Sequence, residues 1–190
     1  IIGPTAVGKT EFSLSLAKEL NAEVISVDSR QVYRYLDVGT DKVSREVRRE
    51  IIHHLIDIAD PDEIYSAADF AQDADGAARR IIARGRVPLL IGGTPFYYRA
   101  LSGALSEDLP KDEAVRAQLA AEIEERGLAA LHDELLEIDP EAGARIHPND
   151  PVRTMRALEI FRITGRNASW WYKEQQKMGS PYDIFYIGLT

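Results

Sequence analysis

Eight residues near the start of the chain have the types and spacing of a phosphate-binding loop. They fit the pattern G-x-x-x-x-G-K-[ST], in which two glycines let the backbone turn until successive N–H groups point at an anion. The residues are, in order, Gly3, Pro4, Thr5, Ala6, Val7, Gly8, Lys9 and Thr10. Lys9 adds a positive charge for the outer phosphates, and the Thr10 hydroxyl can hold Mg²⁺. The loop predicts binding of a diphosphate or triphosphate, but it does not specify a reaction.

An aspartate follows the next predicted strand and is expected to lie beside the phosphate loop. Residues 22–27 read AEVISV, which is typical of a short buried strand, and Asp28 follows them directly. With a helix expected over residues 10–20, the order strand, loop, helix, strand predicts a parallel sheet. Asp28 then lies beside the phosphate loop at the carboxyl end of a strand, where open α/β sheets bind ligands. It can hold Mg²⁺, act as a general base, or simply cap a turn.

A further strand is predicted over residues 87–91, and it ends in Gly92, Gly93 and Thr94. A nucleotide kinase or ATPase often has an acidic residue at this point. Here the glycines either allow a ligand to approach the backbone closely or form a tight turn into the next helix. In that helix, Arg99 either reaches a phosphate or lies on the surface.

Helices are predicted from apolar periodicity and capping residues. The helix over residues 10–20 is expected to face the core through Phe12, Leu16 and Leu20. A second helix, ending near Arg84, is expected to begin with a capping box at Ser66. Its predicted apolar side consists of Phe70, Ala74, Ala77, Ala78, Ile81 and Ile82.

Two shorter features are interpreted as structural. His53 and His54 are taken as loop or core histidines, because two neighbours without a third ligand are a weak metal site. Ile1–Ile2 and residues 183–190 are interpreted as strand segments. Because both ends of the chain then lie in strands, we expect the sequence to be part of a longer protein.

Residues 110–167 read as successive helices, the last of them capped by Asp150 with Pro151 at its first position. We therefore expect an α/β fold with a parallel-sheet core like that of the phosphate-loop NTPases. Residues 1–109 and 168–190 would form this core, and residues 110–167 would be inserted as an all-helical domain.

The composition indicates a globular protein and excludes several classes. The chain has 190 residues, 45% of them hydrophobic and 28% charged, which is enough to bury a core. It contains no cysteine, so disulfides and thiolate metal sites are excluded. No apolar segment approaches the length of a membrane span, and a soluble cytoplasmic protein is expected.

The net charge of −8 argues against a general nucleic-acid coat, but the charge is unevenly distributed. Residues 107–141 contain 12 acidic and 3 basic residues, whereas residues 145–166 contain 5 arginines and 2 acidic residues. An anionic partner would prefer the second segment, where Arg153 and Arg156 fall on one face of the predicted helix. Two solvated helix faces would explain the same pattern.

Six segments of the chain, in this order, resemble the bacterial tRNA dimethylallyltransferase family. They read GPTAVGKT at residues 3–10, VDSRQVY at 27–33, DVGTDK at 37–42, YSAADF at 65–70, IGGTPFYYRAL at 91–101 and HPNDPVRTMRALE at 147–159. The resemblance covers essentially the whole chain. Members of the family are longer at both ends, and their C-terminal portion adds further contacts to tRNA and diphosphate.

The resemblance implies transfer of a dimethylallyl group from dimethylallyl diphosphate to N6 of adenosine 37 in tRNA, with Mg²⁺ as cofactor. The phosphate loop, with Arg99, would bind the diphosphate of the prenyl donor, and Thr10 would be the metal ligand. Asp28 would take the proton from the adenine amine, with Lys9 and Thr94 as the other catalytic residues. The protein is expected to be a monomer whose helical domain grips the anticodon stem-loop.

The resemblance also implies a set of residues that touch the tRNA. They come from the loop after the second strand, from the turn at residue 94, and from two helices of the inserted domain. They are Asp28, Ser29, Arg30, Gln31, Thr94, Arg116, Val152, Arg153, Thr154, Met155 and Arg156.

Three other functions remain open from the residues alone. A phosphate-loop kinase or NTPase would use Asp28 for Mg²⁺ and would prefer ATP to dimethylallyl diphosphate. An isopentenyltransferase for free adenine nucleotides would act on AMP without tRNA. A non-catalytic RNA-binding module would retain its function when Asp28 is replaced by asparagine.

Overall fold

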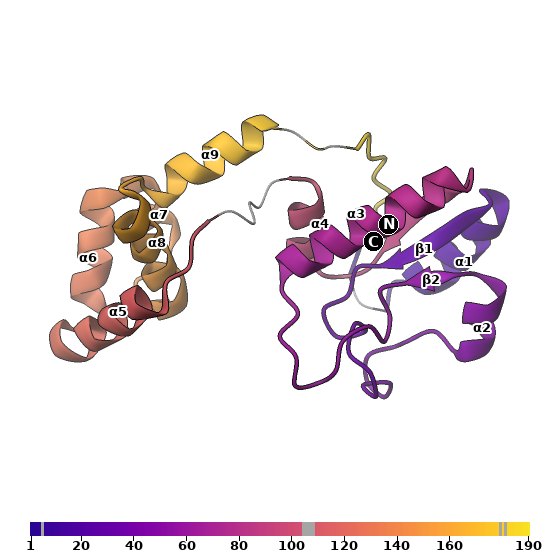
Figure 1. Ribbon diagram of the computed structural model, residues 1–190, viewed down its shortest axis with the longest axis horizontal. Coiled ribbons are helices and arrows are strands. Elements are labelled where there is room, and N and C mark those ends of the chain that lie inside the picture. Colours follow the sequence, from indigo (N-terminus) through magenta and orange to yellow (C-terminus); the bar gives the residue numbers. More distant parts are fainter. Residues whose placement is uncertain (5, 104–108, 179, 181) are drawn as a thin grey trace. The chain divides into compact units, whose positions relative to one another are not determined.

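The computed structural model describes residues 1–4, 6–103, 109–178, 180 and 182–190. The chain divides into two compact units (Figure 1). The first contains Ile1–Gly103 and Ser180–Thr190, and the second contains Ala104–Gly179. The helix α9 (Ala168–Met178), which the sequence assigned to the α/β core, groups with the second unit.

The first unit is built on a parallel sheet of three strands, β1 (Ala22–Ser26), β2 (His53–His54) and β3 (Val87–Ile91). Their order is β2-β1-β3, with Ala22 opposite Val87 and Val24 opposite His53. The predicted parallel α/β arrangement is confirmed. The histidine pair forms a short edge strand, where the sequence predicted loop or core residues.

The described residues of the first unit include four helices, and two of them cover opposite faces of the sheet. They are α1 (Lys9–Glu19), α2 (Arg45–Glu50), α3 (Ala67–Ala83) and α4 (Pro95–Leu101). Alternate residues of a strand point to opposite faces. Val24 packs with α1, whereas Ile25 packs with α3. The predicted capping box at Ser66 is present and begins α3.

The predicted core faces of two helices are partly wrong. In α1 the buried positions are Ser13 and Ala17, whereas Phe12 and Leu20 are exposed. Small side chains let α1 lie close against the sheet, so the larger apolar residues fall at the sides of the contact. In α3 five of the six predicted apolar positions are buried, and Ile82 is exposed.

The two ends of the first unit meet as an isolated parallel bridge outside the sheet. Ile2 pairs with Gly188, with hydrogen bonds of 2.9 Å from Ile2 N to Ile187 O and from Leu189 N to Ile2 O. The predicted strand segments at residues 1–2 and 183–190 are thus reduced to this one bridge. A strand needs repeated backbone pairing, and residues 183–186 have no strand assignment.

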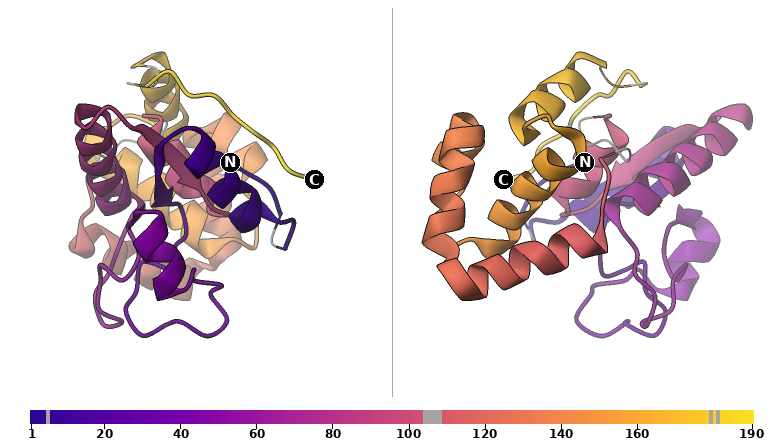
Figure 2. Two further views of the ribbon diagram at one scale, coloured as in Figure 1. Left: turned by 90° about the vertical axis from the view of Figure 1, so that its right-hand side faces the viewer. Right: turned by 60° about the vertical axis from the view of Figure 1, so that its left-hand side comes forward.

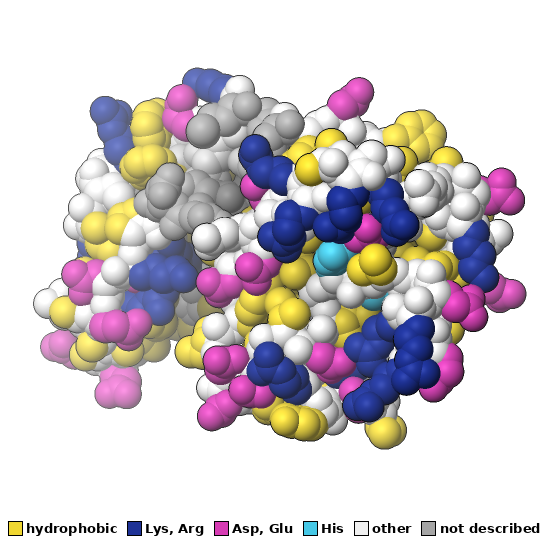
Figure 3. All heavy atoms as spheres, turned by 45° about the vertical axis from the view of Figure 1, so that its right-hand side comes forward, with side chains coloured by type: hydrophobic (Ala, Val, Ile, Leu, Met, Phe, Trp, Pro, Cys, Tyr) yellow, Lys and Arg dark blue, Asp and Glu magenta, His cyan; other side chains and the backbone are white. Residues whose placement is uncertain are grey.

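A buried carboxylate lies in the central strand. The Glu23 side chain is only 1% exposed and accepts hydrogen bonds from Arg84 Nη2 at 2.6 Å and Arg86 Nη1 at 3.3 Å. Its Oε2 also lies 2.7 Å from His54 Nε2. On the face of the molecule drawn in Figure 3, side chains of lysine or arginine (dark blue) lie next to histidine (cyan). Burial alone would raise the pKa of Glu23, but the bonds from His54 and Arg84 outweigh it and lower the pKa.

Replacing Glu23 with glutamine is expected to lower the free energy of unfolding at pH 7 by about 2 kcal/mol. This loss is smaller than the loss expected for a fully buried ion pair, because the Arg84 and Arg86 side chains are about half exposed. A carboxylate with a lowered pKa stabilises the fold above its unfolded pKa, and this contribution is lost as the pH falls below about 4.3. Urea unfolding of the wild type and the variant at pH 7 and at about pH 3 measures both effects, with exposed Glu19→Gln as control. A difference that stayed the same at both pH values would contradict the assignment.

The described residues of the second unit form helices and the segments that connect them. The helices are α5 (Glu113–Arg126), α6 (Leu128–Ile138), α7 (Pro140–Arg145), α8 (Pro151–Thr164) and α9. The connection at Gly127, with a φ of 84°, lets α5 and α6 meet at a sharp angle (Figure 2, right). The predicted Asp150 cap of α8 is confirmed, because its side chain accepts a hydrogen bond from Arg153 N at 3.0 Å.

Leucine, isoleucine and alanine residues from all five helices and from the connecting segments form the core of this second unit. They are Leu109, Leu119, Leu131, Leu135, Ala142, Ile146, Ala157, Leu158, Ile160 and Ala168. Asp139 separates two helices, because it follows the last residue of α6 and its side chain caps the first turn of α7. Across the part of the chain that is described, no helix combines the length and the apolar character that crossing a membrane requires.

Candidate active site

The phosphate loop turns sharply before α1. Ala6 and Gly8 have positive φ values of 65° and 84°, and Gly8 is the residue that precedes the first turn of the helix. The Lys9 ammonium donates to Gly3 O at 2.9 Å and to Pro4 O at 2.5 Å, so it bridges the loop. Thr5 lies outside the described residues. The helix start and the lysine together place positive charge at this position.

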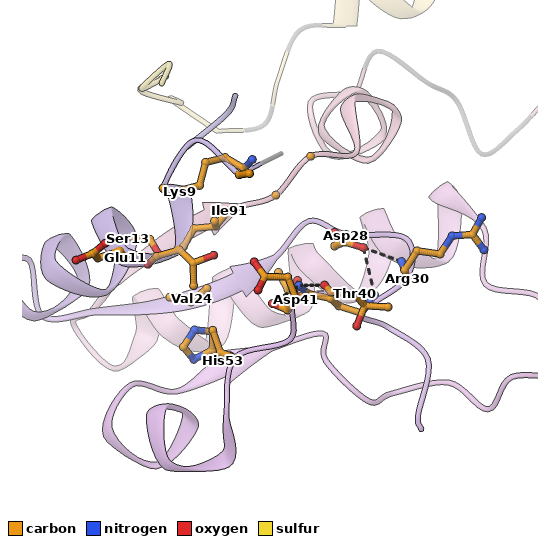
Figure 4. Close-up of a pocket in the computed structure, with 18 of the residues that line it drawn as sticks. Lys9, Glu11, Ser13, Val24, Asp28, Arg30, Thr40, Asp41, His53 and Ile91 are labelled. Atoms are coloured by element: carbon orange, nitrogen blue, oxygen red, sulfur yellow. Dashed lines mark hydrogen bonds between the residues drawn. The ribbon is translucent and has the colours of Figure 1, made fainter. Parts of the chain in front are cut away.

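One cavity of about 500 Å³ adjoins the loop, β1 and β3. Figure 4 shows Lys9 on one side of it, with Asp28, Thr40 and Asp41 on another. The residues that line it are Ala6, Gly8, Lys9, Thr10, Glu11, Ser13, Val24, Ser26, Asp28, Arg30, Gln31, Gly39, Thr40, Asp41, Val43, His53, Ile91, Gly92 and Gly93. The cavity is thus large enough for a small ligand and holds cationic and anionic groups together.

Asp28 occupies the position that the sequence predicted, next to the phosphate loop. Its Oδ1 accepts hydrogen bonds from Arg30 N at 2.8 Å and Gln31 N at 3.2 Å, so it also caps a turn. Because both bonds use the same oxygen, Asp28 can cap the turn and still present the rest of its carboxylate to the cavity. The cap and the functional interpretation are therefore compatible.

Thr94 links the ends of two strands. Its Oγ1 accepts a hydrogen bond from Ser29 N at 3.1 Å, and its own N–H donates to Val27 O at 3.3 Å. It is not among the residues that line the cavity. Thr94 thus fixes the segment that carries Asp28.

Arg99 lies in a neighbouring cavity of about 420 Å³ that also contains Gly3, Tyr98 and Tyr186. The two cavities share Gly92 and Gly93. Arg99 is exposed, and it lines a different cavity from Asp28.

Gln31 and the loop that follows it form a wall of the cavity that the sequence did not predict. Ser26 Oγ donates to Gln31 Oε1 at 2.9 Å, and Gln31 Nε2 donates to Thr40 O at 2.9 Å and Asp41 O at 3.2 Å. The Gln31 amide therefore holds residues 40–41 against the end of β1. From the sequence, the family resemblance pointed to this loop, through Gln31 and the segment at residues 37–42.

His53 also lines the cavity, although its sequence context was interpreted as structural. Its Nδ1 lies 2.7 Å from Ile51 O, and since a carbonyl can only accept, Nδ1 carries the proton. Burial lowers the pKa of His53, so the ring is neutral near pH 7 with an unprotonated Nε2.

In the second unit, two of the arginines predicted to touch RNA bind a buried acid. Arg156 donates to Glu159, to Pro110 O at 2.9 Å and to Leu109 O at 3.1 Å. Arg116 Nε donates to Glu159 Oε1 at 2.9 Å. Burial raises the pKa of Glu159, but the bond from Arg156 and the other donors outweigh it and lower that pKa.

The remaining positions on α8 differ in exposure. The side chain of Arg153 is 75% exposed, and Val152 is also exposed. Thr154 is buried and Met155 is partly buried, packed against the core of the second unit. The Thr154 side chain therefore does not lie on the surface of the second unit, and its contact with tRNA stays a prediction.

Comparison with known proteins gives two matching family models. The model described as IPP transferase matches residues 31–190, and the model described as isopentenyl transferase matches residues 1–54. The tRNA dimethylallyltransferase of Halorhodospira halophila is 53% identical over 181 residues, which is 95% of this chain and 57% of that protein. The chain thus spans little more than half the length of such relatives.

Solved structures are also similar. The full-length tRNA isopentenylpyrophosphate transferase from Bacillus halodurans is 47% identical, with a TM-score of 0.60 over 98% of this chain and 57% of that one. A eukaryotic dimethylallyltransferase acting on tRNA is 30% identical, with a TM-score of 0.80 over 99% of this chain and 46% of that one.

Proposed function

The chain belongs to the tRNA dimethylallyltransferase (IPP transferase) family, and on this premise we propose that the protein prenylates adenosine 37 of tRNA. The donor is dimethylallyl diphosphate, the acceptor is N6 of the adenine, and diphosphate is released. One observation carries the proposal: Lys9 and Thr10 of the phosphate loop line the same cavity as Asp28. A leaving-group site and a base are thus adjacent, as alkylation of a weakly basic amine requires.

The phosphate loop would bind the diphosphate of the donor. Backbone N–H groups, the start of α1 and Lys9 all stabilise negative charge that grows on the leaving group. Lys9 already bridges two carbonyls of the loop, so its ammonium is held in place before the ligand arrives. Arg99, in the neighbouring cavity that also contains Gly92 and Gly93, would add a second cation.

Mg²⁺ fits the donor chemistry of this cavity. Among the described residues, no group of three or more histidine, cysteine, aspartate or glutamate side chains is placed to hold a metal. Mg²⁺ commonly retains waters and takes substrate phosphate oxygens, so the Thr10 hydroxyl with the diphosphate would suffice. When bound, the ion would neutralise charge on the leaving diphosphate.

Asp28 would act as the base. N6 forms a bond to C1 of the dimethylallyl group as the bond from C1 to the diphosphate oxygen breaks, and a proton passes from N6 to the carboxylate. Because an exocyclic amine is barely acidic, this proton leaves as the new bond forms. The adenine must leave the base stack to reach the cavity, as base-modifying enzymes generally require.

The helical unit and the segment after β1 would hold the anticodon stem-loop. Arg30 and Arg153 are exposed cations suited to phosphates, whereas Arg116 and Arg156 would act mainly by organising the unit through Glu159. The sequence-based expectation of a cytoplasmic monomer is part of the same proposal.

Two arginines three residues apart on α8 are expected to respond differently to alanine. Arg153→Ala should weaken stem-loop binding and leave the free energy of unfolding unchanged. The slope of log K for RNA binding against log salt concentration should become smaller in magnitude by about one. Arg156→Ala should lower the free energy of unfolding by about 2 kcal/mol, because buried Glu159 loses a partner. Filter binding at several salt concentrations and urea unfolding measure the two effects. Loss of RNA binding at unchanged stability in Arg156→Ala would make it a direct contact.

The proposal is tested with the protein, radiolabelled dimethylallyl diphosphate, Mg²⁺ and an anticodon stem-loop with the sequence A36-A37-A38. Label is expected in the RNA and lost when A37 is replaced by G. Free AMP is the competing acceptor, since the isopentenyl transferase model also matches residues 1–54. Label in AMP alone would favour that second candidate. ATP hydrolysis without any label would indicate a phosphate-loop NTPase.

A further inference from the structure

The loop between β1 and α2 exposes a short apolar tip. The side chain of Val38 is 99% exposed, Tyr35 is 81% exposed, and Leu36 between them is also exposed. Single apolar residues on a surface are common, but three exposed ones within four residues are unusual enough to suggest a use.

The backbone at the tip is strained at the exposed tyrosine. Tyr35 has a φ of 66°, in the left-handed region that bulky side chains rarely adopt. Glycine would occupy the same conformation without strain. Strain of this kind tends to be retained where the side chain has a use.

The tip is rigidly held, so its exposure does not follow from a loose loop. The Lys42 side chain is 3% exposed, and its ammonium donates to Tyr33 O at 2.6 Å and to the carboxylates of Asp37 and Asp57. Thr40 Oγ1 donates to Leu36 O at 2.6 Å. The backbone of the tip is thus fixed on both sides of Tyr35 before any partner binds.

The same loop continues into the candidate active site. Gly39, Thr40 and Asp41 line the cavity, and the Gln31 amide fixes their position. The apolar tip therefore adjoins the wall of the cavity along the chain, because Val38 directly precedes Gly39. A macromolecule that delivers a group into the cavity would meet this loop.

We propose that Tyr35 is a stacking platform for a nucleobase next to the adenine that enters the cavity. The proposal rests on the proposed function. When one base leaves the stack, the neighbouring base exposes a face that needs a new partner, and an exposed aromatic ring supplies it. Leu36 and Val38 would cover the adjoining ribose. Tyr35 is then a binding residue that takes no part in the chemical step.

Tyr35→Gly is the most informative variant, because it removes the ring and relieves the backbone strain together. With the stem-loop described above, we expect its Kd for RNA to rise about tenfold. The kcat at saturating RNA and the KM for dimethylallyl diphosphate should stay unchanged, and the urea midpoint should rise. Tyr35→Phe should bind RNA as the wild type does. A stem-loop with 2-aminopurine at position 36 or 38 reports stacking directly, through quenching that Tyr35→Gly removes.

The outcomes separate this proposal from the proposed function. Label transfer by the wild type, with equal RNA affinity and equal quenching in Tyr35→Gly, would overturn the stacking role and leave the prenyl transfer intact. A wild type that neither binds nor labels RNA would overturn both. A lower urea midpoint in Tyr35→Gly would mean that the ring packs against the protein itself, which also overturns the proposal.

Discussion

Asp28→Asn is expected to lower the rate of prenyl transfer about a thousand-fold while the protein still binds stem-loop RNA and dimethylallyl diphosphate. Asparagine has the same shape as aspartate, and its Oδ1 can still accept the N–H groups of Arg30 and Gln31. The turn after β1 therefore survives, and only the basicity of the side chain is lost. Single-turnover transfer with saturating enzyme measures the chemical step apart from product release.

The matched control for this variant is Asp41→Asn. Asp41 is a second carboxylate that lines the cavity, and asparagine tolerates its left-handed φ of 52°. It should change the transfer rate only slightly. If both variants slowed transfer equally, the negative charge of the cavity would matter rather than a base at Asp28. If Asp28→Asn restored its rate at high Mg²⁺, Asp28 would be a metal ligand, as in a phosphate-loop kinase.

The parts of the site that the sequence predicted are the ones whose geometry is local. The phosphate loop leads straight into α1, which begins at Lys9, and Asp28 lies two residues after the last residue of β1, so short spacings suffice to place them. Asp150 as a cap and Ser66 as the start of a capping box were predictable for the same reason. Each depends on contacts within four residues.

The contacts that the sequence did not reveal join distant residues. Arg156 shares a helical face with Arg153, and only the fold shows that it binds Glu159 and the backbone at residues 109–110. His53 enters the cavity because β2 pairs with β1. The core face of α1 was misassigned because large apolar residues were given more weight than Ser13 and Ala17. Periodicity gives the direction of a face, but packing decides which face is used.

Gly92→Ala is expected to disrupt both the fold and the site. A Cβ on Gly92 would lie 2.8 Å from Val27 Cα and closer still to the carbonyl of Val27. These are backbone atoms, and that carbonyl already accepts the N–H of Thr94 at 3.3 Å. Neither the backbone at Val27 nor that at Gly92 can therefore shift without disturbing the strand ends. The ends of β1 and β3 would have to separate, which moves Asp28 away from the phosphate loop. We expect a loss of about 3 kcal/mol in the free energy of unfolding and little remaining transfer.

Gly93→Ala provides the matched control, because a Cβ there would meet no atom within 4 Å. Its urea midpoint should stay close to that of the wild type, with a change below about 0.5 kcal/mol. Both glycines line the cavity. If glycine is needed there because the ligand lies against the backbone, both variants should lose binding of dimethylallyl diphosphate to a similar extent. If glycine is needed because two strands approach closely, only Gly92→Ala should unfold at a lower urea concentration than the wild type. Equal stability in the two variants would mean that the close approach of β1 and β3 does not hold the site together.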